Sequence, residues 1–209
     1  MILTDKEILK LVGANIPLIE NFKIESLQSE SYDLSIGGKY SKYLDDFKIV
    51  DLLDQNEINN TYRTDDIPKK GLIIGPHDYV LLCVDERINM PDNITGHIRP
   101  RTRYTRLGLL ISSQHCNSSY SGNLNLGLLN TNPFAVVIHS GMKIAQIVFE
   151  QLMDTPNKAY SGVYQNEDGT KGAVLAKEFF EKEKDTLQAL HDNPEAMQLF
   201  KKIMDSLEK

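Results

Sequence analysis

Arginine residues gather in one short segment of this sequence. Of the six arginines in the 209 residues, four lie between Arg99 and Arg106, and Thr102 and Thr105 lie among them. A guanidinium group can hold a phosphate through two parallel hydrogen bonds, and the threonine hydroxyls add further donors. The same pattern also fits a strand whose arginines pair with surface carboxylates. Residue types alone therefore leave two interpretations open, a phosphate-binding segment or a set of surface ion pairs.

The chain as a whole is acidic. It contains 23 Lys and Arg against 29 Asp and Glu, which gives a formal net charge of −6. Such a balance argues against a broad cationic surface for DNA or RNA, because nucleic-acid binding depends on neutralising many phosphates. We therefore expect no DNA or RNA partner, and any anion site must be local.

Hydropathy and cysteine content exclude further classes of protein. No stretch approaches the roughly 20 apolar residues that span a bilayer, and the first residues, Met1 to Glu7, lack the features of a targeting signal. The two cysteines, Cys83 and Cys116, form no CxxC pair, which disfavours a disulfide framework and a cysteine-based zinc site. We expect a cytoplasmic protein with reduced thiols and no membrane contact.

The elements that must position the arginines are mostly strands. A capping-box pattern from Thr4 to Glu7 predicts a short N-terminal helix that ends at about Gly13. From Tyr32 to Phe149, short apolar segments recur at intervals of roughly ten residues between Gly, Pro, Asn and Asp clusters, which is typical of a sandwich or barrel. The clearest predicted strands are residues 79–84, 107–112, 135–139 and 144–149. Leu124, Leu126 and Leu128 alternate with polar residues and Gly127, so one face of that strand should be core and the other polar or open.

The C-terminal part changes character. Residues 154–172 are rich in Gly, Asn and Asp and predict a long mobile segment without regular structure. Residues 176–191 and 194–208 carry apolar stripes at helical spacing and predict a helical hairpin, with Asn193 as N-cap, that packs on the barrel or on a neighbouring subunit. We expect a β domain at residues 1–175 and a C-terminal helical extension at residues 176–209.

Four segments together resemble one known family. The segment Pro100 to Leu109 resembles the phosphate-binding segment of dCTP deaminases and trimeric dUTPases, and Arg106 before Leu107-Gly108 is closer to the deaminase branch. Three further segments are similar to family motifs in the same order: Gln28 to Gly37, Asn117 to Gly122 with Leu126 and Asn130, and Gly141 to Phe149. Residues 160–172 resemble, more loosely, the C-terminal lid of the deaminases. Four matches in the correct order are far more specific than any single one.

The resemblance implies a fold, an assembly and a ligand. It implies a mainly β subunit, a distorted β-barrel or jelly roll of the dUTPase-like type. It further implies a homotrimer with nucleotide sites at subunit interfaces. The expected ligand is dCTP, dUTP or dTTP with Mg²⁺ on the triphosphate, and no zinc. Carried over by matching motif, the residues expected at the site are Arg106 for catalysis, and Arg101, Thr102, Arg103, Tyr120, Gln146, Tyr160 and Tyr164 for nucleotide binding. Asp33 matches an acidic residue that would act on the metal indirectly, although capping a turn is an equally good role for it.

Two substitutions bear on activity. The deaminase glutamate that moves protons between water and the leaving ammonia aligns with Gly127, and the dUTPase aspartate that activates water aligns with Asn117. Neither a glycine nor an amide can act as a general base, a role that contributes ~10²–10⁴-fold to rate. Val163 also stands where the deaminases often have Lys.

Other groups could take over the lost role. His115 lies two residues before Asn117 and carries an imidazole, the commonest general base. Glu30 adjoins the first motif, and Cys116 has a histidine beside it. The H-x-E and P-C-x-x-C signature of zinc deaminases is absent. Three hypotheses follow: a dCTP deaminase, or less favourably a dUTP diphosphatase; a non-catalytic nucleotide-binding or regulatory homologue; and an interaction module that uses its C-terminal helices.

Overall fold

The computed structural model describes residues 1–44, 49–175 and 193. The chain divides into two compact units, one made of Met1–Asp45 and Tyr62–Gly172 and the other of Asp46–Thr61 and Ala173–Lys209. We call the first the β unit. The predicted helices at 176–191 and 194–208 lie outside the described residues, and the division at residue 175 stays a prediction.

The N-terminal helix of the β unit begins where the capping box predicts it. Helix α1 (Asp5–Val12) has Thr4 as N-cap and Gly13 as C-cap. The Thr4 backbone N–H donates to the Glu7 carboxylate at 3.3 Å, which satisfies one of the unpaired donors of the first turn. Ile8 anchors the helix because its side chain is fully buried.

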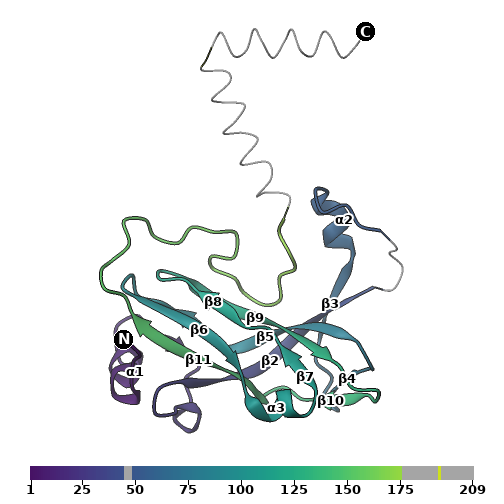
Figure 1. Cartoon of the computed structure of the whole chain (residues 1–209), viewed down its shortest axis with the longest axis horizontal. Coiled ribbons are helices and arrows are strands. Elements are labelled where there is room, and N and C mark those ends of the chain that lie inside the picture. The colour runs from purple at the N-terminus through teal and green to yellow at the C-terminus, as the bar shows by residue number, and fades with distance from the viewer. Residues whose placement is uncertain (45–48, 176–192, 194–209) are drawn as a thin grey trace. The chain divides into compact units, whose positions relative to one another are not determined.

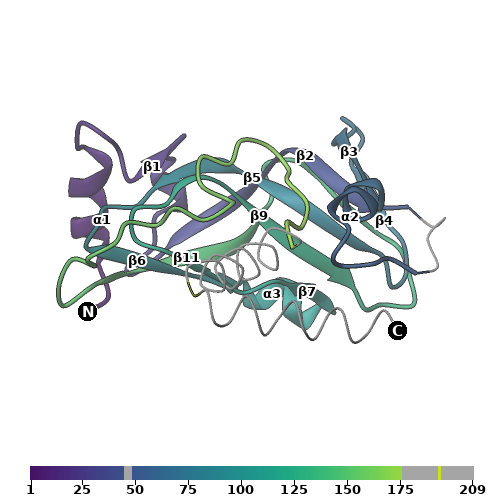
Figure 2. The same cartoon turned by 90° about the horizontal axis from the view of Figure 1, so that it is seen from above.

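The β unit is a large antiparallel sheet. Its central strands follow the order β7-β9-β5-β2-β11-β6-β8, with β1 added to β5 and β3 added to β2, and β4 and β10 form a separate pair (Figure 1). The strands are β1 (Ile19–Glu20), β2 (Tyr32–Tyr43), β3 (Tyr62–Asp66), β4 (Leu72–Ile74), β5 (Tyr79–Asn89), β6 (Ile94–Pro100), β7 (Leu109–Ile111), β8 (Gln114–Cys116), β9 (Ser121–Asn130), β10 (Val136–Ile138) and β11 (Lys143–Gln151). Figure 2, turned by 90°, shows α1 at one end of this unit.

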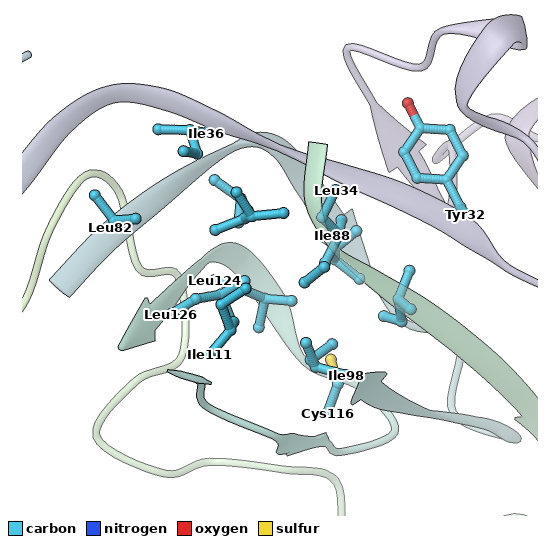
Figure 3. Close-up of a cluster of buried hydrophobic side chains, with 14 of the residues drawn as sticks. Tyr32, Leu34, Ile36, Leu82, Ile88, Ile98, Ile111, Cys116, Leu124 and Leu126 are labelled. Atoms are coloured by element: carbon cyan, nitrogen blue, oxygen red, sulfur yellow. The ribbon is translucent and has the colours of Figure 1, made fainter. Parts of the chain in front are cut away.

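The core lies inside the curled sheet. Figure 3 shows buried side chains of β2, β5, β6 and β9, among them Leu34, Leu82, Ile98 and Leu126, gathered in one interior. Leu124, Leu126 and Leu128 are buried on one face of β9, as the period of two predicts, and Asn125 and Gly127 on its other face are covered as well. The prediction of a mainly β subunit is confirmed.

Several predicted elements change at their ends. The segment predicted as a strand from residue 107 begins only at Leu109, because the arginine segment before it forms the short helix α3 (Thr102–Arg106) and Gly108 turns the chain with a φ of +79°. Two further elements were not predicted: the 3-10 turn η1 (Ile24–Ser26) and, in the second unit, helix α2 (Gln55–Asn60). Asp54 caps α2 by accepting from the backbone of Asn56 and Glu57.

Residues 154–172, here called the lid segment, contain no helix or strand, as predicted. They are nevertheless held along the start of β9 by backbone bonds. The Asn123 N–H donates to the Glu167 carbonyl at 2.9 Å, and the Asn166 N–H donates to the Ser121 carbonyl at 2.7 Å. Across the described parts of the chain, no helix combines the length and apolar character needed to cross a membrane.

Candidate functional site

Arg101 is held in a fixed orientation at the start of α3. Its Nη2 lies 3.4 Å from Oδ2 of Asp33, and its Nη1 donates to the Lys143 carbonyl at 3.2 Å. Asp33 itself lies on β2 with a nearly buried side chain, and Gln28 donates to the same carboxylate at 3.3 Å. The Asp33 carboxylate therefore positions the Arg101 guanidinium rather than capping a turn.

Gln146 lies next to this pair. In the sheet register Gln146 of β11 stands opposite Asp33 of β2 on one side and Arg99 of β6 on the other. Residues directly opposite in antiparallel strands present their side chains on the same face. The structure thus brings Arg99, Asp33 and Gln146 together beside Arg101.

The rest of the arginine segment faces outward. Thr102, Arg103, Thr105 and Arg106 are exposed. Within the described residues neither Arg103 nor Arg106 forms an ion pair, although the chain as a whole has an excess of acidic residues. This outcome favours anion binding over surface ion pairs for these two side chains, because an exposed arginine without a carboxylate keeps its donors available.

The hairpin before β9 supplies a second group. The Tyr120 N–H closes the turn by donating to the Asn117 carbonyl at 3.3 Å, and Ser119 has a φ of +63°. Tyr120 is buried, with its ring edge against Tyr160 of the lid segment at 6.0 Å between centroids. Burial raises the pKa of Tyr120, so its hydroxyl stays protonated and donates to the Asn123 carbonyl. Asn117 is exposed at the tip of the turn.

Side chains also fasten the lid segment to this hairpin. Gln165 accepts from the Ser121 N–H at 3.0 Å and donates to the Ser119 carbonyl at 2.8 Å. Asn125 donates to the Gly169 carbonyl at 3.0 Å. Further along the lid segment, the Lys171 ammonium lies over the Tyr164 ring, 5.6 Å from its centroid. Tyr160 and Tyr164 are therefore placed by lid contacts, whereas the arginines are not near them.

Glu167 is a buried carboxyl at the junction of lid and hairpin. Its Oε1 has no hydrogen-bond partner within the described residues, and burial is the main cause that raises its pKa to about 7. Lys171 and Asn125 act in the opposite direction but do not offset the burial. Sequence inspection missed this residue, because nothing in the polar run from Asn166 to Asp168 indicates which of its side chains is buried.

Gly127 occupies a buried position on β9. Its N–H donates to the Ser112 hydroxyl at 2.9 Å, and its carbonyl accepts from the Ser112 N–H at 2.9 Å. A Cβ at this position would lie 2.7 Å from Cζ of Tyr79, inside the distance that real Cβ atoms keep. The face predicted to be polar or open is therefore filled here by a tyrosine from β5, another residue that the sequence analysis did not single out.

The predicted site residues form two groups within one chain. Strand β7, which follows α3, pairs with the end of β9 (Leu109 with Asn130). The hairpin leads into β9 at Ser121, and the lid segment runs beside the first half of β9, from Ser121 to Asn125. Ten residues of strand span about 30 Å. Figure 1 shows α3 at one edge of the β unit and the lid segment at the other. A single chain thus does not bring Arg101 and Arg106 to Tyr120 and Tyr160.

Of the three residues considered as substitutes for the missing base, Cys116 lies near Tyr120 and Tyr160, whereas His115 and Glu30 are exposed. His115 is exposed on β8, with its Nε2 3.4 Å from the Thr95 hydroxyl and its ring 5.1 Å from that of His97. Burial raises the pKa of Cys116 to about 12, which keeps this thiol protonated and unreactive. The Glu30 carboxylate accepts from the Ser29 hydroxyl on the surface.

Candidate metal ligands do not cluster in the part of the chain that the structure describes. In residues 1–44, 49–175 and 193, no group of three or more His, Cys, Asp or Glu side chains could hold a metal ion. Mg²⁺ needs no such group where a triphosphate supplies most of its oxygen ligands. A role for Asp33 toward the metal stays a prediction.

The fold of this chain resembles that of a protein of known structure. The structure is similar to that of 2′-deoxycytidine 5′-triphosphate deaminase from Agrobacterium tumefaciens, with a TM-score of 0.58 and 19% sequence identity over 71% of this chain and 47% of that chain. The chain therefore shares the fold of this dCTP deaminase.

Sequence comparison gives the family itself. The family model described as dCTP deaminase-like matches residues 2–152. A protein named dCTP deaminase, dUMP-forming, from Sulfurihydrogenibium sp. is 33% identical over 176 residues, covering 84% of this chain and 97% of the relative. A protein of the same name from Persephonella marina is 30% identical with the same coverage. The chain belongs to the dCTP deaminase-like family.

Proposed function

We propose that this chain binds a deoxypyrimidine nucleoside triphosphate together with Mg²⁺, and that it deaminates dCTP slowly or not at all. The observation that supports binding is the arginine segment. Arg101 is oriented by the buried Asp33, while Arg103 and Arg106 stay exposed without a carboxylate partner in the described residues. Each guanidinium group can donate two parallel hydrogen bonds to two oxygens of a phosphate.

Each residue has a definite task in this proposal. Arg101, Arg103, Arg106 and Thr102 bind the phosphates, with Gln146 beside them. The hairpin with Tyr120 and the lid segment with Tyr160 and Tyr164 enclose the sugar and base. Because Tyr120 is buried beneath the hairpin, its ring acts by shaping that enclosure.

Deamination of dCTP adds water at C4 of the base and releases ammonia. The reaction needs a group that takes a proton from the water and delivers one to the leaving nitrogen. Neither Gly127 nor Asn117 can do this, and both stand at the positions where the family resemblance implies a carboxylate. This observation favours a second candidate function, a nucleotide-binding or regulatory protein without turnover.

We also propose that the site is completed by another copy of the chain. The two groups of site residues lie at opposite ends of β9, about 30 Å apart. An assembly in which α3 of one subunit meets the hairpin of the next would unite them, and a closed ring of three subunits would make three such sites. The homotrimer is the assembly that the resemblance implies.

Turnover is tested by incubation with dCTP and with dUTP in the presence of Mg²⁺. Ammonia and pyrophosphate should be measured in the same reactions, because formation of dUMP, the product named for the relatives, requires loss of both. We expect neither to rise above background at short times. Fast release of ammonia would overturn the expectation of slow or absent deamination and leave the binding proposal intact.

Binding is tested by calorimetry with dCTP, dUTP, dTTP and the corresponding ribonucleotides. Arg106→Ala should weaken binding of every deoxynucleotide at least tenfold, since it removes a charge-assisted phosphate contact. Arg63→Ala is the matched control, because Arg63 is exposed on β3 and its Nε is paired with Asp65 at 2.6 Å. Equal affinity for both variants, or no binding by the unaltered protein, would refute the proposed function.

A further inference from the structure

Gly127 is a glycine because of space and not because of backbone conformation. It is absent from the residues with positive φ, so its backbone suits any amino acid. A Cβ at this position would instead lie against the phenol of Tyr79, 2.7 Å from Cζ and 2.8 Å from Cε2, and closer still to the hydroxyl oxygen. The tyrosine thus occupies the volume that a side chain at position 127 would fill.

The sheet register explains how Tyr79 reaches this place. Leu81 of β5 stands opposite Gly127, and Tyr79 lies two residues along the same strand on the same face. A diagonal neighbour at this spacing is within reach of an aromatic side chain. Tyr43 of β2 packs against the Tyr79 ring at 5.8 Å between centroids, with the rings tilted by 33°. The phenol is therefore supported on one side and directed at Gly127 on the other.

The Tyr79 hydroxyl has hydrogen-bonding capacity left over. No described residue is its hydrogen-bond partner, and 38% of the residue is exposed. Burial of the ring raises the pKa of this phenol above its ordinary value of 10, so the hydroxyl keeps its proton at neutral pH. A neutral phenol donates a strong hydrogen bond but cannot take a proton from water.

We infer that Tyr79 is a specificity-determining residue, whose hydroxyl takes the place of a side chain at position 127 and donates a hydrogen bond to the 4-oxo oxygen of a uracil or thymine base. This inference rests on the proposed function, and on the family resemblance, which implies that residue 127 acts at C4 of the base. A carboxylate here would accept from the 4-amino group of cytosine, whereas a phenol is the better donor. The site should therefore prefer dUTP and dTTP over dCTP.

The binding test compares Tyr79→Phe with the unaltered protein, using dUTP, dTTP and dCTP in calorimetry. Loss of one hydroxyl donor should weaken dUTP and dTTP binding about tenfold and change dCTP binding less than twofold. Tyr43→Phe is the matched control, because it removes a hydroxyl from the adjoining tyrosine and should leave all three affinities unchanged. If Tyr79→Phe leaves the ratio of dUTP to dCTP affinity unaltered while Arg106→Ala still weakens binding at least tenfold, the inference is overturned and the proposed function stands.

A ligand-independent measurement tests the steric part. Gly127→Glu should lower the thermal midpoint by several degrees, since the new side chain must displace the phenol. The double variant Tyr79→Val with Gly127→Glu should recover most of that loss. If the single variant is as stable as the unaltered protein, Tyr79 does not fill this position and the inference fails, whatever the nucleotide affinities are. If no nucleotide binds the unaltered protein, the proposed function and the specificity role fail together.

Discussion

Among the described ion pairs, the pair of Asp33 and Arg101 is the least exposed to solvent. Their side chains are 3% and 19% exposed, whereas Arg63 and Asp65 on β3 are 67% and 40% exposed. Removing one partner of a buried pair leaves an uncompensated charge, whereas an exposed pair contributes little. The two pairs therefore provide a matched comparison within one chain.

From this we predict that Asp33→Ala lowers the free energy of unfolding by about 3 kcal/mol, as buried pairs typically do when one partner is removed. Asp65→Ala should lower it by less than about 1 kcal/mol. Urea unfolding at pH 7, followed by circular dichroism, measures both. Equal losses for the two variants would mean that Asp33 does not hold Arg101 in solution.

Single residues were only partly predictable from the sequence. The arginine segment was found because several arginines close together in a sequence suggest an anion site without any knowledge of the structure. The pairing of Asp33 with Arg101 and the filling of position 127 by Tyr79 were not found, because both depend on which strands adjoin and in which register. The two residues of each pair are more than 45 positions apart in the sequence, so no local sequence pattern contains both of them.

At the scale of elements, the lid segment depends on the protonation of one side chain. The Glu167 carboxyl is buried against β9 with a pKa raised from 4.5 to about 7. Between these two values the docked state holds a proton that the open state releases. Stability of docking is therefore greatest below pH 4.5, falls as pH rises through the interval, and is constant above about 7. The shift corresponds to at most about 3 kcal/mol.

We accordingly predict that the lid segment opens more often at pH 7.5 than at pH 5. Hydrogen exchange of the Asn123 and Asn166 amides, whose bonds join lid and hairpin, measures the opening, after correction for the intrinsic pH dependence of exchange. Glu167→Gln should remove the difference between the two pH values. Asp168→Asn, a neighbouring exposed carboxylate, should preserve it, and a difference that survives in Glu167→Gln would contradict the assignment.

Elements were predicted well where periodicity was strong. Strands β5, β9 and β11 were expected, because short runs of alternating or continuous aliphatic residues are typical of strands. Helix α3 was missed, since five residues of mostly β-branched, aromatic and arginine character have no helical period. The absence of regular structure in the lid segment was predicted, but its docking was not, because that docking uses backbone groups, which every sequence has.

At the scale of the whole molecule, the distribution of the site residues along β9 has a direct consequence. The arginine segment adjoins one end of β9 and the hairpin with the lid segment adjoins the other. If the nucleotide site is built from both, each site draws on two subunits. Two chains that are each defective in a different half should then complement one another.

We predict that co-expression of Arg106→Ala and Tyr160→Ala chains restores the high-affinity deoxynucleotide binding that each variant alone has lost. With random assembly into a ring, an interface is intact only when one chain supplies its unaltered arginine segment and the next its unaltered hairpin, which happens in about one interface in four. Calorimetric stoichiometry near a quarter of a site per chain is the expected result. Mixing the two purified homo-oligomers without subunit exchange serves as the control and should give no binding. A co-expressed mixture that binds no more than the separate variants would mean that both halves of the site come from the same chain, because defects in one chain cannot be rescued by its neighbour.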